Sequence, residues 1–195
     1  MKYSKRQYEI LNKSIKLIAE KGIQSLTIKN LSKSIGITEP AIYRHFENKF
    51  EILKAILSLF KDEIESNYSH LKSPGLSPLE KLEKIFDFHI EKFNSNPHYA
   101  SVIFSEELFK NDPKLATIIE KIMLFNIEKT KKIIQEGQKT GEIRNDIKTE
   151  ELAIIFLGSL RLLVKEWVQG NFKSDLLKKG KSFKKSILKI IKNNC

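Results

Sequence analysis

The chain has 195 residues, of which 41% are hydrophobic and 30% are charged, a mixture that excludes a disordered chain and allows a buried core. Its 8 glycines and 5 prolines are too few for a turn-rich β protein and favour helices. Cys195 is the single cysteine, which excludes a disulfide within the chain, and we find neither a long apolar run nor a signal peptide. We therefore expect a cytoplasmic protein with no membrane segment.

The formal net charge of +11 is concentrated near the two ends of the chain. Residues 1–50 hold ten Lys or Arg and four Asp or Glu, and residues 173–195 hold eight and one. A basic N-terminal segment is what binding to phosphate groups requires. The basic C-terminal segment has a simpler interpretation as a solvated helix face.

The first part of the chain predicts two helices. Apolar side chains recur at helical spacing from Tyr8 to Ala19, and Gly22 supplies a stop just beyond them. Thr27 can cap a second, short helix, which ends at Gly36. A glycine at that position tolerates a positive φ angle, so a tight turn is expected there.

A third helix follows the turn directly. Thr38 can serve as its N-cap, and Pro40 falls in the first turn, where a missing N–H costs little. Ile42 and Phe46 would be buried, leaving a polar outer face. Two short helices across a glycine turn form a helix-turn-helix, whose second helix lies in the major groove of DNA.

The pattern stays helical through the rest of the chain. A fourth helix begins at Asn48, and the sequence SPGLSP at residues 73–78 then breaks the chain. Further helices are predicted over residues 79–93, 99–111, 113 to about 137, 149–170 and 174–191. Gly141 is expected to close the helix that begins at residue 113, and Ser174 is expected to open the last one. The sequence therefore predicts an all-α protein of about nine helices.

The segment LTIKNLSKSIGITEPAIYRHFENKFEIL resembles the DNA-binding domain of the TetR/AcrR family of transcriptional regulators. The resemblance is specific over residues 8–55 and rests on AEKG followed by Thr27, the Gly36 turn, the AIYRHF run and the ENK that opens the fourth helix. It implies a helix-turn-helix DNA-binding domain over residues 1–48 and a helical ligand-binding and dimerisation domain over residues 49–195. It also implies a homodimer that binds a palindromic operator, more often as a repressor than as an activator.

The resemblance marks a set of candidate DNA contacts. They are Thr27, Lys29, Thr38, Glu39, Pro40, Ala41, Tyr43, Arg44, His45 and Lys49. The phenol of Tyr43 suits a phosphate, although its ring could pack against the first helix instead. His45 can donate a ring N–H to phosphate, although a lone histidine is usually only a surface residue. Lys49 lies where side-chain charge and helix dipole both attract an anion, and Thr27 can combine a phosphate contact with its capping role.

The sequence leaves open which of these residues contact the bases of DNA. Lys29 matches a position where some family members place a base-contacting basic residue. Arg44 suits guanine O6 and N7 or a phosphate. Glu39 either accepts a hydrogen bond from cytosine N4 or only complements the helix dipole.

The second domain is expected to bind a small hydrophobic effector of unknown identity, such as a lipid, a fatty acyl group, an aromatic compound or a drug. The candidate pocket residues are Phe60, Phe86, His89, Phe93, Phe104, Met123, Phe125 and Phe156. Most aromatic residues of the domain must belong to its ordinary core. For His89, the alternative to a pocket role is a hydrogen-bonded core histidine.

The last two predicted helices have apolar faces that are broad for a helix resting on one lobe. Paired with the same helices of a second copy, they would form a four-helix interface. The candidate interface residues are Leu160, Leu163, Trp167, Phe183 and Ile187, and the alternative is ordinary core packing.

Other classes of function fit less well. The sequence lacks nucleotide-binding, zinc-protease and nucleophile motifs, and its four histidines show no ligand spacing, so we expect no enzymatic activity, no metal and no cofactor. One rival is a non-specific DNA-binding protein that uses the basic ends of the chain. The other is a helical small-molecule-binding protein with a degenerate DNA-binding head.

Overall fold

A computed structural model describes residues 2–71, 75–105 and 112–193. Its helices are α1 (Lys5–Lys21), α2 (Ile28–Ile35), α3 (Glu39–Tyr43), α4 (Lys49–His70), α5 (Pro78–Ser95), α6 (Pro97–Ile103), α8 (Pro113–Thr140), α9 (Thr149–Gln169) and α10 (Leu176–Ile191). A 3-10 turn, η1 (Ile23–Ser25), precedes α2. The described residues contain no strand, so the all-α prediction is confirmed. Residues 106–111 of the helix predicted over 99–111 lie outside the described part.

The chain divides into two compact units. Unit 1 comprises Met1–Asp62 and His98–Glu120, and unit 2 comprises Glu63–Pro97 and Lys121–Cys195. Both α4 and α8 contribute residues to each unit. The domain boundary predicted between residues 48 and 49 falls at the start of α4, whereas unit 1 continues to Asp62, so the division into domains 1–48 and 49–195 stays a prediction.

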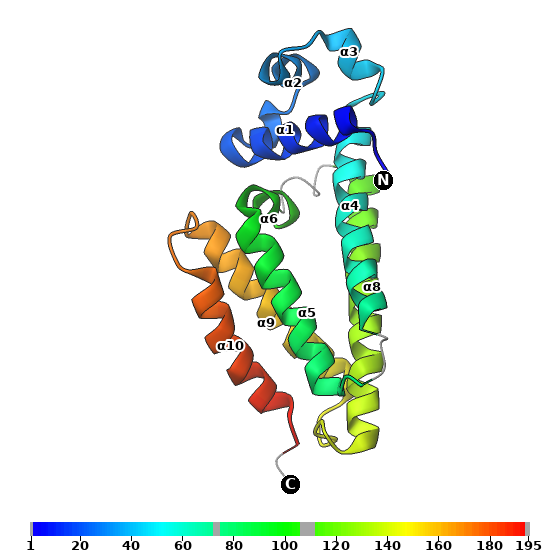
Figure 1. Ribbon diagram of the computed structural model, residues 1–195, viewed down its shortest axis with the longest axis vertical. Coiled ribbons are helices and arrows are strands. Elements are labelled where there is room, and N and C mark those ends of the chain that lie inside the picture. Colours follow the sequence, from blue (N-terminus) through cyan, green and yellow to red (C-terminus); the bar gives the residue numbers. More distant parts are fainter. Residues whose placement is uncertain (1, 72–74, 106–111, 194–195) are drawn as a thin grey trace. The chain divides into compact units, whose positions relative to one another are not determined.

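Unit 1 is organised by α1 and the two short helices that follow it (Figure 1). The start of α1 is fixed by a capping box, in which Ser4 Oγ accepts from the Gln7 amide and Gln7 Oε1 accepts from the Ser4 amide. Its end is set by Gly22, which has a φ of 77°. The side chains buried around these helices include Ile10, Leu11, Leu26, Leu31 and Ile42. Each contributes about 1.5–3 kcal/mol to folding by leaving water.

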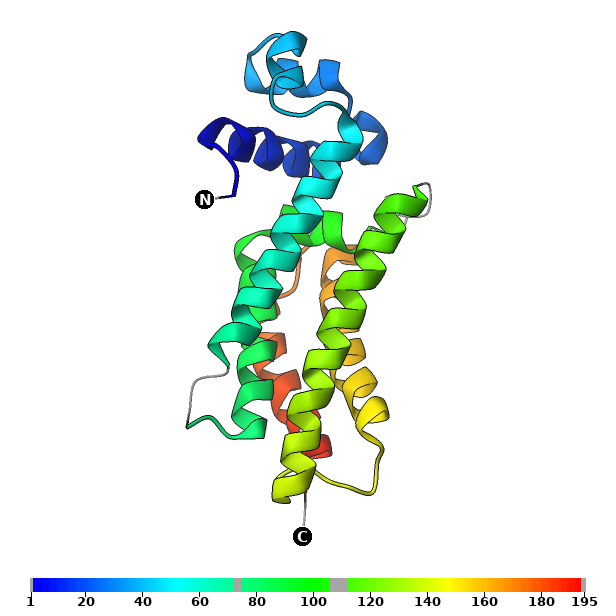
Figure 2. The same cartoon turned by 90° about the vertical axis from the view of Figure 1, so that its right-hand side faces the viewer.

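Unit 2 places α5 against α9 and α10, which run antiparallel to each other (Figures 1 and 2). The fully buried ring of Phe86 packs edge-on against Phe156 and stacks with Phe183, at centroid distances of 6.2 and 6.4 Å. A Cβ atom at Gly180 on α10 would lie 2.9 Å from Ile90 Cγ2 on α5. The missing side chain at Gly180 therefore lets the two helices approach closely.

Three helix boundaries differ from the sequence prediction. The helix predicted over 99–111 is α6, which ends at Ile103, and residues 104 and 105 lie outside any helix. Helix α8 does not end near Gly137 but continues to Thr140, and Gly141 follows with a φ of 77°. A Cβ atom at Gly137 would lie 2.5 Å from Ile143 Cδ1, so this glycine serves close packing. The cap of α10 is Asp175, which accepts from the Lys178 amide, and not Ser174.

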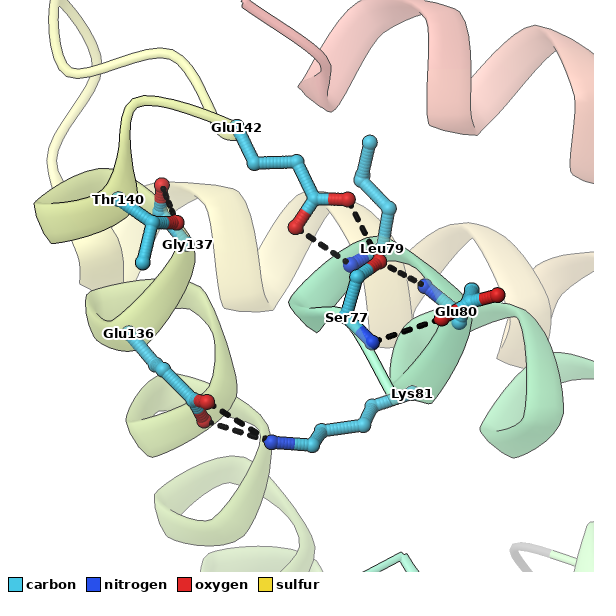
Figure 3. A network of polar contacts seen from close by, with 8 residues as sticks. All are labelled: Ser77, Leu79, Glu80, Lys81, Glu136, Gly137, Thr140 and Glu142. Carbon is cyan, nitrogen blue, oxygen red and sulfur yellow. Dashed lines mark hydrogen bonds and ion pairs between the residues drawn. The ribbon is translucent and has the colours of Figure 1, made fainter. Parts of the chain in front are cut away.

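The start of α5 is tied to the end of α8 by polar contacts (Figure 3). Ser77 caps α5 and donates its hydroxyl to Glu142 Oε1 at 2.6 Å, while Glu142 Oε2 accepts from the Leu79 amide at 3.4 Å. Lys81 Nζ lies 2.9 Å from both carboxylate oxygens of Glu136 on α8.

None of the described helices combines the length and apolar composition that a membrane span requires.

Candidate DNA interface and effector cavity

The turn between α2 and α3 is built on one left-handed residue. Gly36 adopts φ 78° and ψ 33°, and the amides of Gly36 and Ile37 both donate to the Ser32 carbonyl, at 2.9 and 3.1 Å. Thr38 then occupies the N-cap position with extended backbone, but its hydroxyl makes no capping hydrogen bond. The predicted helix-turn-helix is therefore present, and the Thr38 side chain is left exposed for another partner.

The third helix has a buried side that holds it in place and an exposed polar side. Ile42 and Phe46 are both buried, as the sequence predicted. Tyr43 is 52% exposed, so its ring is not taken up by packing against α1. The other candidates are placed as follows: Thr27, Lys29, Thr38, Glu39, Pro40 and Arg44 are exposed, and Ala41 and His45 are half-buried. The exposed groups include the hydroxyl, carboxylate and guanidinium that can meet phosphates or base edges.

Lys49 has a structural partner that the sequence did not reveal. Its ammonium donates to the Ile23 carbonyl in η1 at 3.0 Å, and burial lowers the pKa of Lys49 below its ordinary value. Lys49 is the first residue of α4, so this bond joins the start of α4 to the turn that precedes α2. An ammonium has three donors, and the other two remain for a phosphate.

Gln7 of α1 holds the segment that directly follows α3. Its side-chain amide donates to the His45 carbonyl at 3.3 Å, while its oxygen completes the capping box of α1. The spacing of Ser4 and Gln7 is the signature of a capping box and could have identified the cap. No local pattern marks the long-range bond to His45. The end of α3 is thus fixed to the first turn of α1.

The predicted pocket residues take several different positions. Phe60 packs edge-on against Tyr99 in unit 1, where Phe104 is half-buried. In unit 2, Phe86 and Phe156 form the core pair, Phe93 is buried beside His89, and Met123 is 42% exposed. Phe125 lines a cavity of unit 2.

His89 has the surroundings of a core histidine. It is buried, and its Nδ1 lies 2.8 Å from the Ile85 carbonyl one turn earlier, so Nδ1 carries the proton. Burial lowers the pKa of His89 because the charged imidazolium would lose its water. Among the described residues, no group of three His, Cys, Asp or Glu side chains is placed to hold a metal ion.

The cavity lies between α4, α5 and α8 within unit 2 and has a volume of about 570 Å³. Its lining residues are Glu65, Tyr68, Ser69, Leu71, Lys81, Phe125, Lys129, Lys132, Ile133 and Glu136. The hydroxyl of Tyr68 is bonded to Asn126, and it lies 2.8 Å from Thr130 Oγ1. Burial raises the pKa of Tyr68, so the phenol is neutral and can donate. No local motif marks Tyr68 or the cavity lysines, so the sequence did not predict them as ligand contacts.

The candidate interface residues of α9 and α10 lie mostly inside the protomer. Leu160, Leu163, Trp167 and Ile187 are buried and Phe183 is half-buried. Trp167 donates its indole N–H to the Ser174 carbonyl at 2.9 Å. The large apolar side chains that α9 and α10 leave exposed are Ile154, Leu162, Leu177 and Ile190. Contact of α9 and α10 with a second copy stays a prediction. The four exposed side chains are better placed for such a contact than the candidate residues that the sequence suggested.

Two family models match the chain. One is described as bacterial regulatory proteins, tetR family, and matches residues 10–56; the other is described as YsiA-like protein, C-terminal region, and matches residues 52–190. The chain belongs to the TetR family. It is thus a DNA-binding transcriptional regulator with a helical ligand-binding domain, as the sequence predicted.

Individual relatives agree with this assignment. The transcriptional repressor KstR2 of Rhodococcus jostii is 27% identical over 167 residues, which cover 84% of this chain and 80% of that protein. The fatty acid metabolism regulator protein of Bacillus subtilis is 26% identical over 182 residues, 91% of each chain. The structure of B. subtilis FadR in complex with stearoyl-CoA has a TM-score of 0.75 at 22% identity, covering 93% of this chain and 97% of that one. These relatives are named as regulators and not as enzymes.

Proposed function

We propose that the protein is a homodimeric repressor that binds a palindromic operator and is released from it by a hydrophobic small molecule. The observation that carries the proposal is the helix-turn-helix, in which Ile42 and Phe46 anchor α3 and leave its polar face exposed. The matching family models and the repressors among the relatives support the same function.

Contacts to DNA divide into those that position the protein and those that read sequence. Tyr43, His45 and Lys49 serve the phosphates, because a phenol, an imidazole N–H and an ammonium are all donors. Arg44 and Lys29 are the exposed cations that can reach base edges. Thr38 and Glu39 open α3, the end of a recognition helix that meets the bases.

A second copy is expected to cover the exposed face of α9 and α10. Ile154 and Leu162 are 62% and 66% exposed, which leaves two large apolar side chains of α9 in water in the isolated protomer. Gly158 lies between them in sequence and is also exposed, with open space around the position of a Cβ atom. Antiparallel pairs from two protomers can therefore pack closely as a four-helix interface.

A fatty acyl thioester is the first candidate for the effector. The support is the complex of B. subtilis FadR with stearoyl-CoA and the named role of the B. subtilis relative in fatty acid metabolism. The effector would act by favouring a state in which the two reading heads cannot span half-sites one helical turn apart. A differential affinity of about 3 kcal/mol corresponds to a shift of roughly 150-fold.

The test is selection of bound sites from random duplex DNA by the purified protein at near-physiological salt. A shared palindrome is expected, and addition of stearoyl-CoA should then lower affinity for that palindrome. Retention of DNA without a shared sequence would favour the rival, a non-specific DNA-binding protein. Absence of any DNA binding would favour the helical small-molecule-binding protein with a degenerate head.

A further inference from the structure

The cavity between α4, α5 and α8 has two chemically distinct kinds of wall. Leu71, Phe125, Ile133 and the ring of Tyr68 are apolar, and the Tyr68 and Phe125 rings pack edge-on at 6.0 Å. The remaining wall is largely charged. A volume of about 570 Å³ falls in the range of roughly 300–1,000 Å³ that small-molecule sites occupy. A fitting ligand therefore combines an apolar part with a charged group.

The sign of that charged group follows from the lysines. Lys81, Lys129 and Lys132 line the cavity, against the carboxylates of Glu65 and Glu136. Across the described residues, neither Lys129 nor Lys132 forms an ion pair with a carboxylate, and Lys129 Nζ instead lies 5.1 Å from the centre of the Phe125 ring. Two lysines at one cavity that form no ion pair within the described residues favour an anionic ligand.

Lys81 supplies a third cation that is already held in place. Its side chain is 14% exposed, and its ammonium lies at 2.9 Å from Glu136, whose own side chain is 49% exposed. Figure 3 shows Lys81 reaching from α5 to Glu136 on α8. Because Glu136 is half in water, it can turn away at little cost when another anion takes its place on Lys81. The bonds of Glu142 to Ser77 and Leu79 would still hold the start of α5 after that exchange.

We infer that this cavity binds the anionic group of an amphiphilic effector, with Lys81, Lys129 and Lys132 around the charge and Tyr68 and Phe125 along the apolar part. The inference rests on the proposed function for its link to gene regulation, but binding itself does not require DNA. Tyr68 belongs to α4, which is one continuous helix from Lys49 to His70. The site thus includes a residue of the helix that follows the DNA-binding segment.

Two sources share the required chemistry. A free fatty acid offers a carboxylate on an apolar chain, and an acyl-CoA offers phosphates on a thioester of the same chain. Decanoate, decanoyl-CoA and the uncharged decanol therefore serve as three probes of equal chain length. Stronger binding of decanoate than of decanoyl-CoA identifies the carboxylate as the preferred group, and the reverse order identifies the phosphates.

The experiment measures binding of the three probes to the whole protein by titration calorimetry, without DNA. The double variant Lys129→Met and Lys132→Met keeps two unbranched side chains, each shorter by one atom, and removes both charges. It should lose at least about tenfold in affinity for the preferred anion, because both lysines would lose their charge-assisted contacts to it. Its affinity for decanol should not change. Lys139→Met, an exposed lysine on the same helix outside the lining, is the matched control and should bind all probes as the parent does.

A further variant tests the exchange at Lys81. Glu136→Gln removes the competing charge and should raise affinity for the anion several-fold. If the double variant fails to fold, Lys132→Gln alone provides the same comparison, because Lys132 is exposed and unpaired within the described part of the chain. Equal affinity of parent and lysine variants for the anions, or binding of decanol as tight as that of either anion, would overturn the inference. Operator selection is a separate measurement, so an operator released by stearoyl-CoA alongside unaffected lysine variants would refute this site and leave the proposed function standing.

Discussion

The ammonium of Lys49 donates to the carbonyl oxygen of Ile23, so the first residue of α4 holds the 3-10 turn that leads into α2. A side chain that the sequence marks for a phosphate thus also fixes the helix-turn-helix internally. The two roles have different consequences when the side chain is removed. Stability and DNA affinity can therefore be measured separately on the same variants.

Lys49→Ala is expected to lower the free energy of unfolding by about 0.5–1.5 kcal/mol, the worth of a typical hydrogen bond. It should also weaken binding to all DNA sequences alike, and the slope of log affinity against log salt should fall by about one if Lys49 contacts a phosphate. Urea unfolding and DNA titration at several salt concentrations measure the two effects. A loss of affinity confined to certain base sequences would instead make Lys49 a reader of bases.

Gly36→Ala should destabilise the protein by about 1–2 kcal/mol, because a side chain disfavours the left-handed conformation. Open space surrounds the position of a Cβ atom there, so the cost is one of backbone conformation and not of a clash. Gly36→Asn is the matched control and should lose less, since asparagine tolerates this conformation. Thermal unfolding of the two variants provides the comparison. Equal losses would show that the φ of 78° is not what limits this position.

Glu39→Gln should change base preference at the operator if the carboxylate accepts from cytosine N4. Glu39 is exposed at the start of α3, where the same carboxylate can act only on the helix dipole. Site selection with parent and variant separates the two roles. Identical selected sequences, with a small loss of stability, would assign Glu39 to the dipole alone.

His89 should make the protein less stable in mild acid. Its pKa in the folded protein lies below the ordinary value of 6.5, so unfolding takes up a proton once the pH falls below about 6.5. The contribution of this group is therefore complete above that pH and is lost as the pH falls toward its folded-state pKa. His89→Phe removes the titrating group and should make stability less dependent on pH below about 6.5 than in the parent. His98→Gln, at an exposed position, is the control for the removal of a histidine elsewhere in the chain.

If the proposed dimer forms through the exposed face of α9, Leu162→Lys should dissociate it and leave the protomer folded. Leu162 is 66% exposed, and surface substitutions usually change stability by less than about 0.5 kcal/mol. Leu160→Ala, two residues away, removes a buried side chain and should cost about 2–5 kcal/mol of stability. Sedimentation and thermal unfolding distinguish the two results. A Leu162→Lys variant that sediments as the parent does would place any interface elsewhere.

The parts of the fold that the sequence predicted are those with a local signal. Gly22 and Gly36 end their helices because a positive φ favours glycine, and Ile42 and Phe46 are buried because their spacing puts them on one face. The cap of α10 could not be chosen from sequence alone. Ser174 and Asp175 are adjacent and both suit an N-cap, and the Ser174 carbonyl is used by Trp167 instead.

The features that the sequence did not predict depend on long-range packing. The apolar residues of α9 and α10 point in several directions, and periodicity alone does not say which of them the protomer itself covers. Leu160 and Leu162 are equally apolar, yet one is buried and the other is exposed. The lysines of the cavity have no local signature either, because Lys81 and Lys132 come to line one cavity only through folding.

The close approaches at Gly137 and Gly180 also bear on how random mutagenesis of this regulator should be interpreted. At either position an added Cβ atom would lie within 3.0 Å of an isoleucine side chain, Ile143 or Ile90. Neither glycine lies in the helix-turn-helix or lines the cavity. Intolerance to substitution at these two positions would therefore report damaged packing, and it should not be counted as evidence for a signalling route between effector and DNA.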